Sequence, residues 1–257
     1  MLLAAAALAQ TAGPHDAVTW RTIVNEDGAV LGHASSEVVR RPKGRDIVET
    51  QDISLQELGG SPTYMTARNV LSEDADGAIL SLSATSRAGR FWTRTEARIS
   101  NGAAYIVRET PSRRWTHVAP LPAAVRFDDG EGLLLGWDPL VTPRLEFNNF
   151  NLDAMDVERV VIEAAPNPAG GALTAMRRRY DRDQLVGIAR LTLDREGRVV
   201  EAAQPMFGAT IHMRVTDRAT ALGPHPPYQV VPNAMTRSPF RISASASQGR
   251  VRYRLSF

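Results

Sequence analysis

The stretch Thr93-Arg94-Thr95-Glu96-Ala97-Arg98-Ile99-Ser100 decides the fold class. Charged residues stand at every second position, and the positions between them carry small or apolar residues. Successive side chains of a β-strand point to opposite faces, so this alternation predicts a strand with one face in water and one in a core. The same pattern recurs over 209–215 and 250–257. Repeated strands with one wet face are typical of antiparallel sheets.

Short turn motifs separate the alternating stretches. Asp27-Gly28, Asp76-Gly77 and Asn101-Gly102 suit tight hairpins, and residues 194–197 suit a longer turn. We therefore predict an antiparallel β domain over residues 10–222. Its strands are expected near 18–25, 29–40, 45–57, 63–73, 78–87, 91–100, 103–110, 143–150, 156–164, 172–181, 184–194, 198–204 and 208–216, with a further one near 248–256.

Residues 128–139 interrupt the strand pattern. Asp128 and Asp129 are N-cap residues, an apolar cluster follows, and Pro139 ends the stretch. We expect a short helix near 130–137 that joins two β-rich halves. Because an open sheet has one apolar face to cover, the predicted fold is all-β. It is a curved, mainly antiparallel sheet, an unclosed barrel, with this helix packed on its inner face.

The two ends of the chain carry different signals. Residues 1–9 are apolar and end in the small-residue pattern of a signal peptidase site, which predicts a signal peptide and a periplasmic or otherwise exported bacterial protein. Residues 223–239 are rich in proline and are expected to be a linker. The terminal strand segment 240–257 either returns to the main sheet or begins another module. No transmembrane segment is expected, since no stretch approaches the roughly 18 apolar residues of a spanning helix.

Composition and missing motifs remove several function classes. The chain has no cysteine, which excludes a disulfide framework and a thiol nucleophile. Its five histidines lack metal-ligand spacing, and no hydrolase, nucleotide or dinucleotide motif is present. We therefore predict no catalytic residue, no metal, no cofactor and no enzyme. The 30 basic and 28 acidic residues leave a net charge of +2, so no nucleic acid is expected as a partner. The densest basic run, Arg177-Arg178-Arg179, is interpreted as a solvated edge strand.

Six apolar side chains are the candidate ligand-binding residues. Four would line a cavity between the sheet and the predicted helix: Leu133, Leu134, Leu135 and Trp137. The other two, Phe147 and Phe150, stand three residues apart and cannot share one face of a regular strand. Either one ring turns outward and forms a binding edge with the neighbouring asparagines, or a β-bulge keeps both rings in the core, which is the favoured interpretation.

The order of these motifs resembles a known class of domain. Asp27-Gly28 with Leu31-Gly32-His33, the 73–77 hairpin, the 132–135 segment with Asp138-Pro139, and the 193–199 strand entry look like the exported bacterial β-domain that precedes transglutaminase-like catalytic domains. Residues 251–256 resemble the junction to that catalytic domain, and the likeness spans about 20–255. Transglutaminase-like catalysis uses a Cys nucleophile and a His base. Since the chain has no cysteine, the resemblance implies a non-catalytic accessory domain.

Two functions are consistent with these features. The first is a non-enzymatic periplasmic or cell-envelope domain that scaffolds or binds a protein partner, as an accessory of a transglutaminase-like system. The alternative is a periplasmic carrier that holds an acyl chain or another apolar small molecule in a half-barrel cavity. A cavity lined by Leu133, Leu134, Leu135 and Trp137, rather than filled by them, would favour the carrier.

Overall fold

A single large sheet dominates the computed structural model, which describes residues 18–57, 60–127, 133–165, 173–206 and 209–230. Among these residues one short helix is present, α1 (Arg218–Ala221), and no helix is long and apolar enough to cross a membrane. The strands are β1 (Thr19–Asn25), β2 (Val30–Arg41), β3 (Gly44–Glu57), β4 (Pro62–Asp74), β5 (Ile79–Ala88), β6 (Phe91–Ser100), β7 (Ala103–Thr110), β8 (Arg113–Pro120), β9 (Arg144–Asn151), β10 (Asp156–Ala165), β11 (Leu173–Asp181), β12 (Gln184–Leu193), β13 (Val199–Met206), β14 (Ala209–Thr216) and β15 (Tyr228–Val230).

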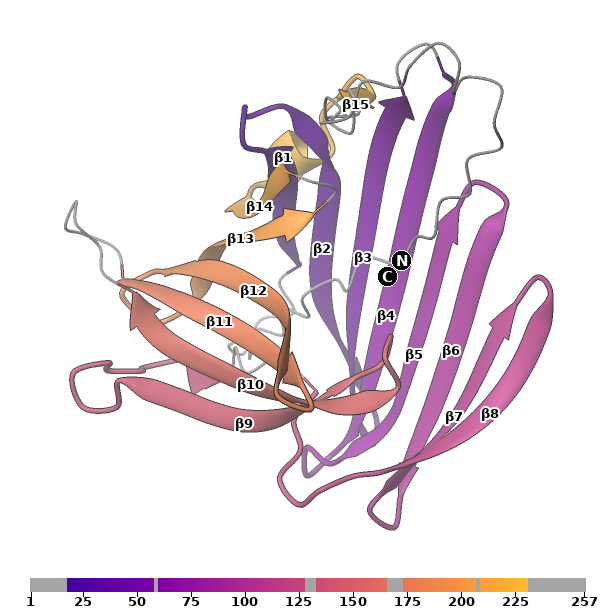
Figure 1. Cartoon of the computed structure of the whole chain (residues 1–257), viewed down its shortest axis with the longest axis vertical. Coiled ribbons are helices and arrows are strands. Elements are labelled where there is room, and N and C mark those ends of the chain that lie inside the picture. Colours follow the sequence, from indigo (N-terminus) through magenta and orange to yellow (C-terminus); the bar gives the residue numbers. More distant parts are fainter. Residues whose placement is uncertain (1–17, 58–59, 128–132, 166–172, 207–208, 231–257) are drawn as a thin grey trace, which may run out of the picture.

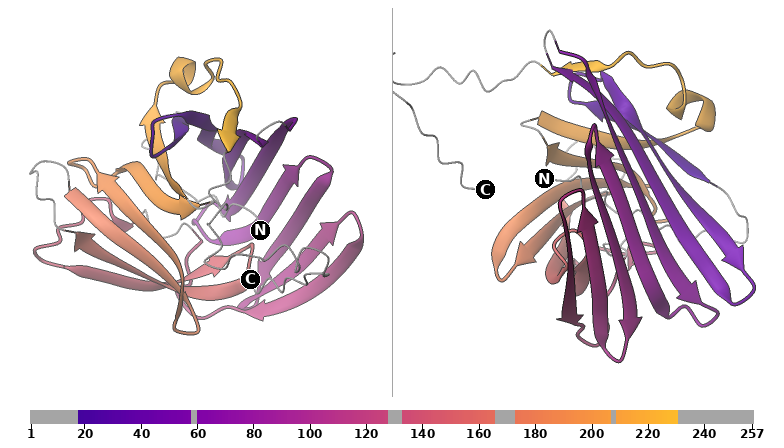
Figure 2. Two further views of the ribbon diagram at one scale, coloured as in Figure 1. Left: turned by 45° about the horizontal axis from the view of Figure 1, so that its top comes forward. Right: turned by 90° about the vertical axis from the view of Figure 1, so that its right-hand side faces the viewer.

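The sheet consists of two antiparallel meanders joined at their first and last strands. Its order is β8-β7-β6-β5-β4-β3-β2-β1-β14-β13-β12-β11-β10-β9, so β1 pairs with β14 and the strands β8 and β9 are the two edges. The sheet curves without closing, and the β9–β14 half lies across the base of the long β3–β8 strands (Figure 1; Figure 2). The predicted all-β, antiparallel, unclosed sheet is confirmed.

The turn residues act as their chemistry predicts. Asn101 and Gly102 adopt φ values of 50° and 70°, and they connect β6 to β7 in a two-residue hairpin with Ser100 opposite Ala103. Both positions of such a turn need positive φ, which Asn and Gly tolerate best. Strand β8 was not predicted, because its hairpin with β7 turns through Pro111-Ser112 and carries no Asn-Gly or Asp-Gly signal.

The inner face of the curved sheet holds the larger of two cores, called here the major core. Its fully buried members come from both meanders and include Ile23, Ile162 and Leu191. The remaining buried members are Leu31, Ile53, Leu134, Val160, Ala175, Ala189, Leu193, Val199, Ala202, Ile211 and Met213. Both meanders therefore contribute to one continuous core, which makes the sheet a single packed unit.

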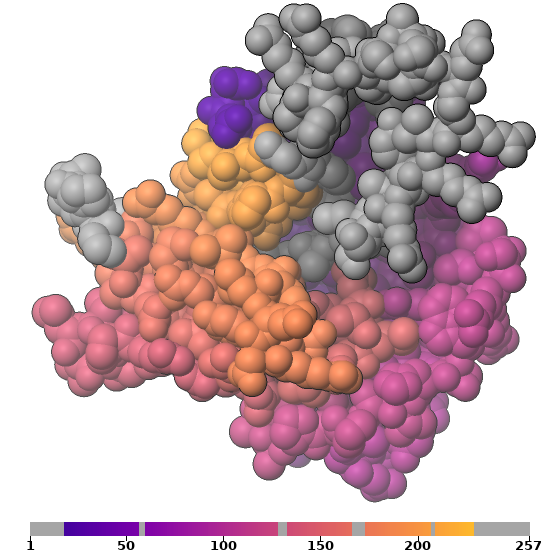
Figure 3. All heavy atoms as spheres, viewed as in Figure 1, coloured from indigo at the N-terminus to yellow at the C-terminus, as the bar shows by residue number. Residues whose placement is uncertain are grey.

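A second cluster, the minor core, forms where the β9 edge meets the inner face of β5–β8. It consists of Leu82, Ala97, Ala104, Ile106, Ala119 and Phe150. The register places Phe150 on the opposite face of β9 from Phe147, which packs against the major core. The β9 edge is thus covered by side-chain packing, and Figure 3 shows the second half seated against the first. Arg126 adds a single bridge to Asn149 on the outer edge of β9.

Arg108 fixes this overlap between the two halves. From the inner face of β7 its guanidinium donates to the carbonyl oxygens of Leu152 (2.9 Å) and Asp153 (2.7 Å) in the β9–β10 turn, and to the Thr95 hydroxyl (2.9 Å). Burial lowers the pKa of Arg108, and nearby Asp153 opposes this. Burial also raises the pKa of Asp153 above its usual range, although Arg108 and Arg179 pull it down. The turn is therefore held mainly through its backbone carbonyls.

The segment expected to be a helix near 130–137 follows a different path. Residues 128–132 lie outside the described part, and Leu134 to Trp137 form one tight turn, in which the Trp137 N–H donates to the Leu134 carbonyl (3.1 Å). Gly136 has a φ of 68°, and its N–H donates to the Glu196 carbonyl (3.1 Å). A helix through 133–137 is therefore wrong, because a left-handed residue and a bond to the β12–β13 turn replace the helical backbone pattern.

The short helix lies elsewhere and is held by its cap. The Asp217 carboxylate accepts from the Thr220 N–H (2.9 Å), which satisfies a free donor of the first turn of α1. The helix contacts β1 and β2, and Arg218 lies 5.9 Å from the centre of the Trp20 ring. It covers one end of the outer face of these strands, since Trp20 and His33 share that face and stack against each other.

The proline-rich segment 223–239 is not a linker throughout. Tyr228–Val230 form β15, which pairs in parallel with Leu55–Glu57 at the end of β3. The pairing of β3 with β2 ends at Ile53, so that edge of β3 is open for another strand. The Tyr228 hydroxyl also accepts from the Asn25 side-chain amide (2.9 Å). The linker interpretation is wrong over these three residues, while the predicted segments 1–9 and 240–257 lie outside the described residues.

Candidate functional site

Strand lengths create an open end on the inner face. Strands β3 and β4 have 14 and 13 residues, whereas the strands of the second half have 8 to 10. At about 3.3 Å per residue, β3 is roughly 13 Å longer than the longest of them. The second half therefore covers only part of the inner face of β3–β6. The uncovered part lies where β4 begins and β5 ends.

A cavity of about 260 Å³ occupies this open end. The register places its inward side chains on four adjacent strands, β3 to β6. They are Gln51, Met65, Ala67, Ser86, Ala88, Phe91 and Thr93. The neighbouring strand residues Thr66, Arg87 and Trp92, whose side chains belong to the other face, complete the wall. We call this site the inner cavity. Most of its inward side chains are small or apolar, with one amide and two hydroxyls.

Two side chains of the inner cavity are energetically unusual. Phe91 is 65% exposed although it lies on the inner face, and the Arg90 guanidinium lies over its ring at 5.2 Å from the ring centre. Gln51 is only 4% exposed, and its Oε1 atom has no hydrogen-bond partner among the described residues. A buried acceptor without a donor is costly. The cavity thus presents a largely exposed aromatic ring and an acceptor that lacks a donor among the described residues.

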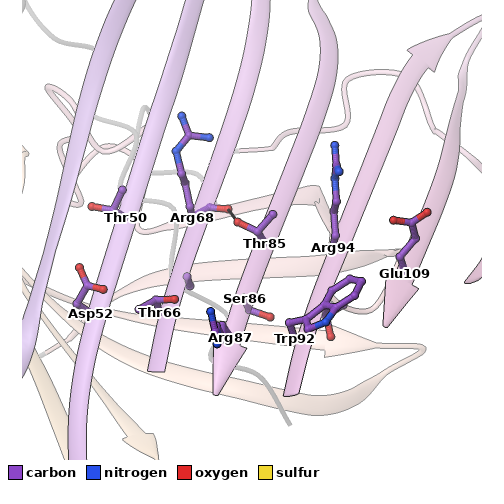
Figure 4. A pocket seen from close by; sticks show the side chains of 12 residues that line it. Thr50, Asp52, Thr66, Arg68, Thr85, Ser86, Arg87, Trp92, Arg94 and Glu109 are labelled. Carbon is purple, nitrogen blue, oxygen red and sulfur yellow. Dashed lines mark hydrogen bonds between the residues drawn. The ribbon is translucent and has the colours of Figure 1, made fainter. Parts of the chain in front are cut away.

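The outer face of the same strands carries a second, larger hollow. This cavity of about 470 Å³ crosses β3 to β7 and is polar; we call it the outer groove (Figure 4). One row of directly opposed residues contains Thr50, Arg68, Thr85, Arg94 and Glu109. The neighbouring row contains Asp52, Thr66, Arg87 and Trp92. The two rows are two residues apart along each strand, so all nine side chains share one face.

The candidate residues from the sequence lie mainly in the cores. Leu134 is fully buried in the major core, Trp137 and Phe147 pack against it, and Phe150 is buried in the minor core. Leu135 is exposed and Leu133 is half-buried. None of the six lines the inner cavity or the outer groove. Ligand binding by these six residues stays a prediction.

The pair of phenylalanines follows neither of the two expected arrangements. Strand β9 pairs with β10 in a continuous register, so no bulge forms between Phe147 and Phe150. Their rings point to opposite faces, as a regular strand requires, and each enters a different core. Phe150 is buried and Phe147 is half-buried, because the β9 edge is covered on its two faces.

The basic run 177–179 was also interpreted wrongly. Strand β11 lies between β10 and β12, so it is not an edge, and Arg177 is 2% exposed. Arg179 lies on the same inner face and pairs with buried Glu158 at 3.6 Å. A Cβ on Gly187 would lie 2.8 Å from the Arg179 Nε, so glycine leaves room for this guanidinium. No cluster of three or more His, Asp or Glu suited to a metal occurs among the described residues.

Sequence reasoning missed both cavities, although each left a local signal. Phe91 and Trp92 are adjacent, and adjacent side chains of a strand point to opposite faces. One aromatic ring therefore lies on each face of β6. Gln51 stands at an inward position between Ile47 and Ile53, where an apolar residue is expected. Such polar residues in apolar positions indicate either an internal partner or a ligand.

Comparison with known proteins supports the fold. No protein-family model matches the chain, and no curated protein matches it. A solved structure, the beta-barrel-like protein of the domain of unknown function DUF1849 from Brucella abortus, superposes with a TM-score of 0.57 at 11% identity. The match covers 78% of this chain and 95% of that chain. The likeness is one of fold.

Proposed function

We propose that the protein is a non-enzymatic, exported binding module that takes an apolar group with a hydrogen-bond donor into the inner cavity. The observation that carries the proposal is the combination of Phe91 and Gln51 in one hollow. The exposed ring offers apolar contact, and the Gln51 Oε1 atom is a buried acceptor that a ligand donor would satisfy.

The size of the inner cavity limits what it can enclose. Pockets for small molecules typically span about 300–1,000 Å³. At about 260 Å³ the inner cavity suits one end of a longer ligand, with the rest extending along the open inner face. An acyl chain that carries a hydroxyl or amide N–H fits this description, as does an apolar side chain of a partner protein. We favour the acyl chain because the apolar wall is interrupted by only a few polar atoms.

Export and an accessory role complete the proposal. The apolar residues 1–9 support export to the periplasm. The resemblance to the domain that precedes transglutaminase-like catalytic domains supports a role beside such an enzyme, and the missing cysteine supports a non-catalytic one. Co-purification of the exported protein with a transglutaminase-like enzyme from the same bacterium would support the accessory role, and its absence from the periplasmic fraction would refute export.

Titration calorimetry with 1-octanol and its methyl ether tests the binding site. The two probes share an apolar chain, but only the alcohol donates a hydrogen bond, so the alcohol should bind more tightly. Phe91→Ala should weaken 1-octanol binding at least about fivefold, because the ring contributes apolar contact. Tyr64→Ala is the matched control: Tyr64 is 63% exposed but lies outside the cavity. Equal effects of the two substitutions, or no binding of either probe, would refute the proposal.

A further inference from the structure

We propose that the outer groove is a second binding site, which takes an acidic glycan, a sugar chain bearing carboxylates. The groove lies on the face of β3–β7 opposite to the inner cavity. The two sites share the strand residues Thr66, Ala67, Ser86, Arg87, Trp92 and Thr93, whose side chains alternate between the two faces. The inference is therefore independent of the ligand proposed for the inner cavity. It rests on the charge balance of the groove and on the kinds of side chain in its two rows.

The charge balance of the groove favours an anion. Glu109 pairs with Arg114 (3.1 Å) and Arg94 pairs with Glu96 (2.5 Å). The Asp52 carboxylate lies 3.4 Å from the His33 imidazole, a contact that is an ion pair only when the ring is protonated. Each of the two carboxylates of the groove therefore contacts a histidine or arginine side chain at the edge of the groove. The arginines at its centre determine what it attracts.

Two central arginines have no carboxylate partner among the described residues. The Arg68 guanidinium takes part in no ion pair, and the Arg87 Nε donates only to the backbone oxygen of Gly89 (3.0 Å). They stand diagonally on adjacent strands, since Arg68 opposes Thr85 and Arg87 opposes Thr66. Diagonal neighbours in a sheet are about 7–8 Å apart. Two exposed arginines on neighbouring strands are suited to separate carboxylates on one extended ligand.

The other side chains of the groove favour a sugar chain as the carrier of these carboxylates. Trp92 is 40% exposed and places an indole ring at one side of the groove, where the apolar face of a sugar ring can pack (Figure 4). Thr66 supplies a hydroxyl that can donate and accept, as sugar hydroxyls require. The Thr50 hydroxyl already hydrogen-bonds the Ser35 hydroxyl (2.7 Å), and the Thr85 hydroxyl donates to the Arg68 carbonyl (3.4 Å) and can still accept. The long, shallow shape across five strands suits a chain rather than a compact molecule.

A nucleic acid fits the same groove less well. Sequence-tolerant binding of single strands uses several aromatic side chains on which successive bases stack. Among the described residues, Trp92 is the one aromatic residue that lines this groove. The groove therefore favours an acidic glycan over a single-stranded nucleic acid.

Calorimetry with a hexamer of galacturonic acid tests the site, and the fully methyl-esterified hexamer is the matched neutral probe. The acidic hexamer should bind to the full chain and the esterified one at least tenfold more weakly, with the difference shrinking as salt rises. The double variant Arg68→Gln/Arg87→Gln should weaken binding of the acidic hexamer at least tenfold. Arg98→Gln removes an exposed arginine of the same face outside the groove, so it should change binding less than twofold.

Three outcomes would overturn the proposal. Equal binding of the acidic and esterified hexamers would show that the arginines do not select for charge. A similar loss in Arg98→Gln and in the double variant would indicate general attraction to a basic surface. Tighter binding of oligo(dT) in the same assay would identify a single-stranded nucleic acid as the better ligand. Arg87 also lines the inner cavity whereas Arg68 does not, so 1-octanol binding to the single variant Arg68→Gln reports separately on the inner cavity.

Discussion

Replacing Leu134 by alanine should strongly destabilise the protein. Leu134 has no exposed surface and lies in the major core among side chains from both halves of the sheet. Leu→Ala changes in cores cost about 2–5 kcal/mol, and the cost rises when the surroundings cannot collapse into the space. Here the turn at Gly197 is in direct contact, because a Cβ on that glycine would lie 1.9 Å from the Leu134 carbonyl oxygen. We therefore expect a loss of about 3–5 kcal/mol.

Urea unfolding followed by tryptophan fluorescence measures this loss, and Leu135→Ala provides the matched control. Leu135 is the next residue in the turn but is 37% exposed, so its truncation should cost less than about 1 kcal/mol. In thermal unfolding the Leu134 variant should lose roughly 6–20 °C, at about 2–4 °C per kcal/mol for a domain of this size. Similar losses for both variants, or a loss below about 1 kcal/mol for Leu134→Ala, would contradict the placement of Leu134 as a core residue.

Two further changes test the backbone and the electrostatics. Gly197→Ala should cost at least about 2 kcal/mol in urea unfolding, because φ is 83° and a Cβ would clash with Leu134. Gly28→Ala has the same strain (φ 82°) but open space, so equal losses would contradict the clash. Burial raises the pKa of Asp153, so its contribution to stability is full below its ordinary pKa and is lost as pH rises through the raised value. Asp153→Asn should therefore unfold at a higher temperature than the parent at pH 7 and at a similar temperature near pH 3, whereas equal differences at both pH values would refute this reasoning.

The strands could be predicted from the sequence because their signals are local. Period-two alternation and Asn-Gly or Asp-Gly turns act over a few residues, and most expected strands between residues 18 and 216 match those of the structure within about two residues. Strand β8 was missed because its turn lacks such a signal, and β15 because three residues between prolines show no period. The pairing of β1 with β14 joins the first strand of one meander to the last strand of the other, far apart in the sequence, and no local pattern encodes such a contact.

The candidate site could not be predicted in the same way. The apolar run 133–135 correctly indicated burial, but Gly136 turns the chain so that Leu134 fills the core instead of lining a cavity. The inner cavity arises from the surplus length of β3 and β4 over the strands opposite them. That mismatch is visible only when both halves are placed in one sheet. Only this placement shows that Phe91 and Gln51 line the same cavity.

Methyl NMR of the protein labelled at its methionine methyl groups tests the binding proposal most directly. Met65 lines the inner cavity, whereas Met213 is buried in the major core, and a Met65→Leu variant assigns the Met65 signal. On titration with 1-octanol, we predict that the Met65 resonance shifts and saturates while the Met213 resonance stays in place. A Met65 signal that does not move, or equal shifts of both signals, would contradict a ligand site in the inner cavity.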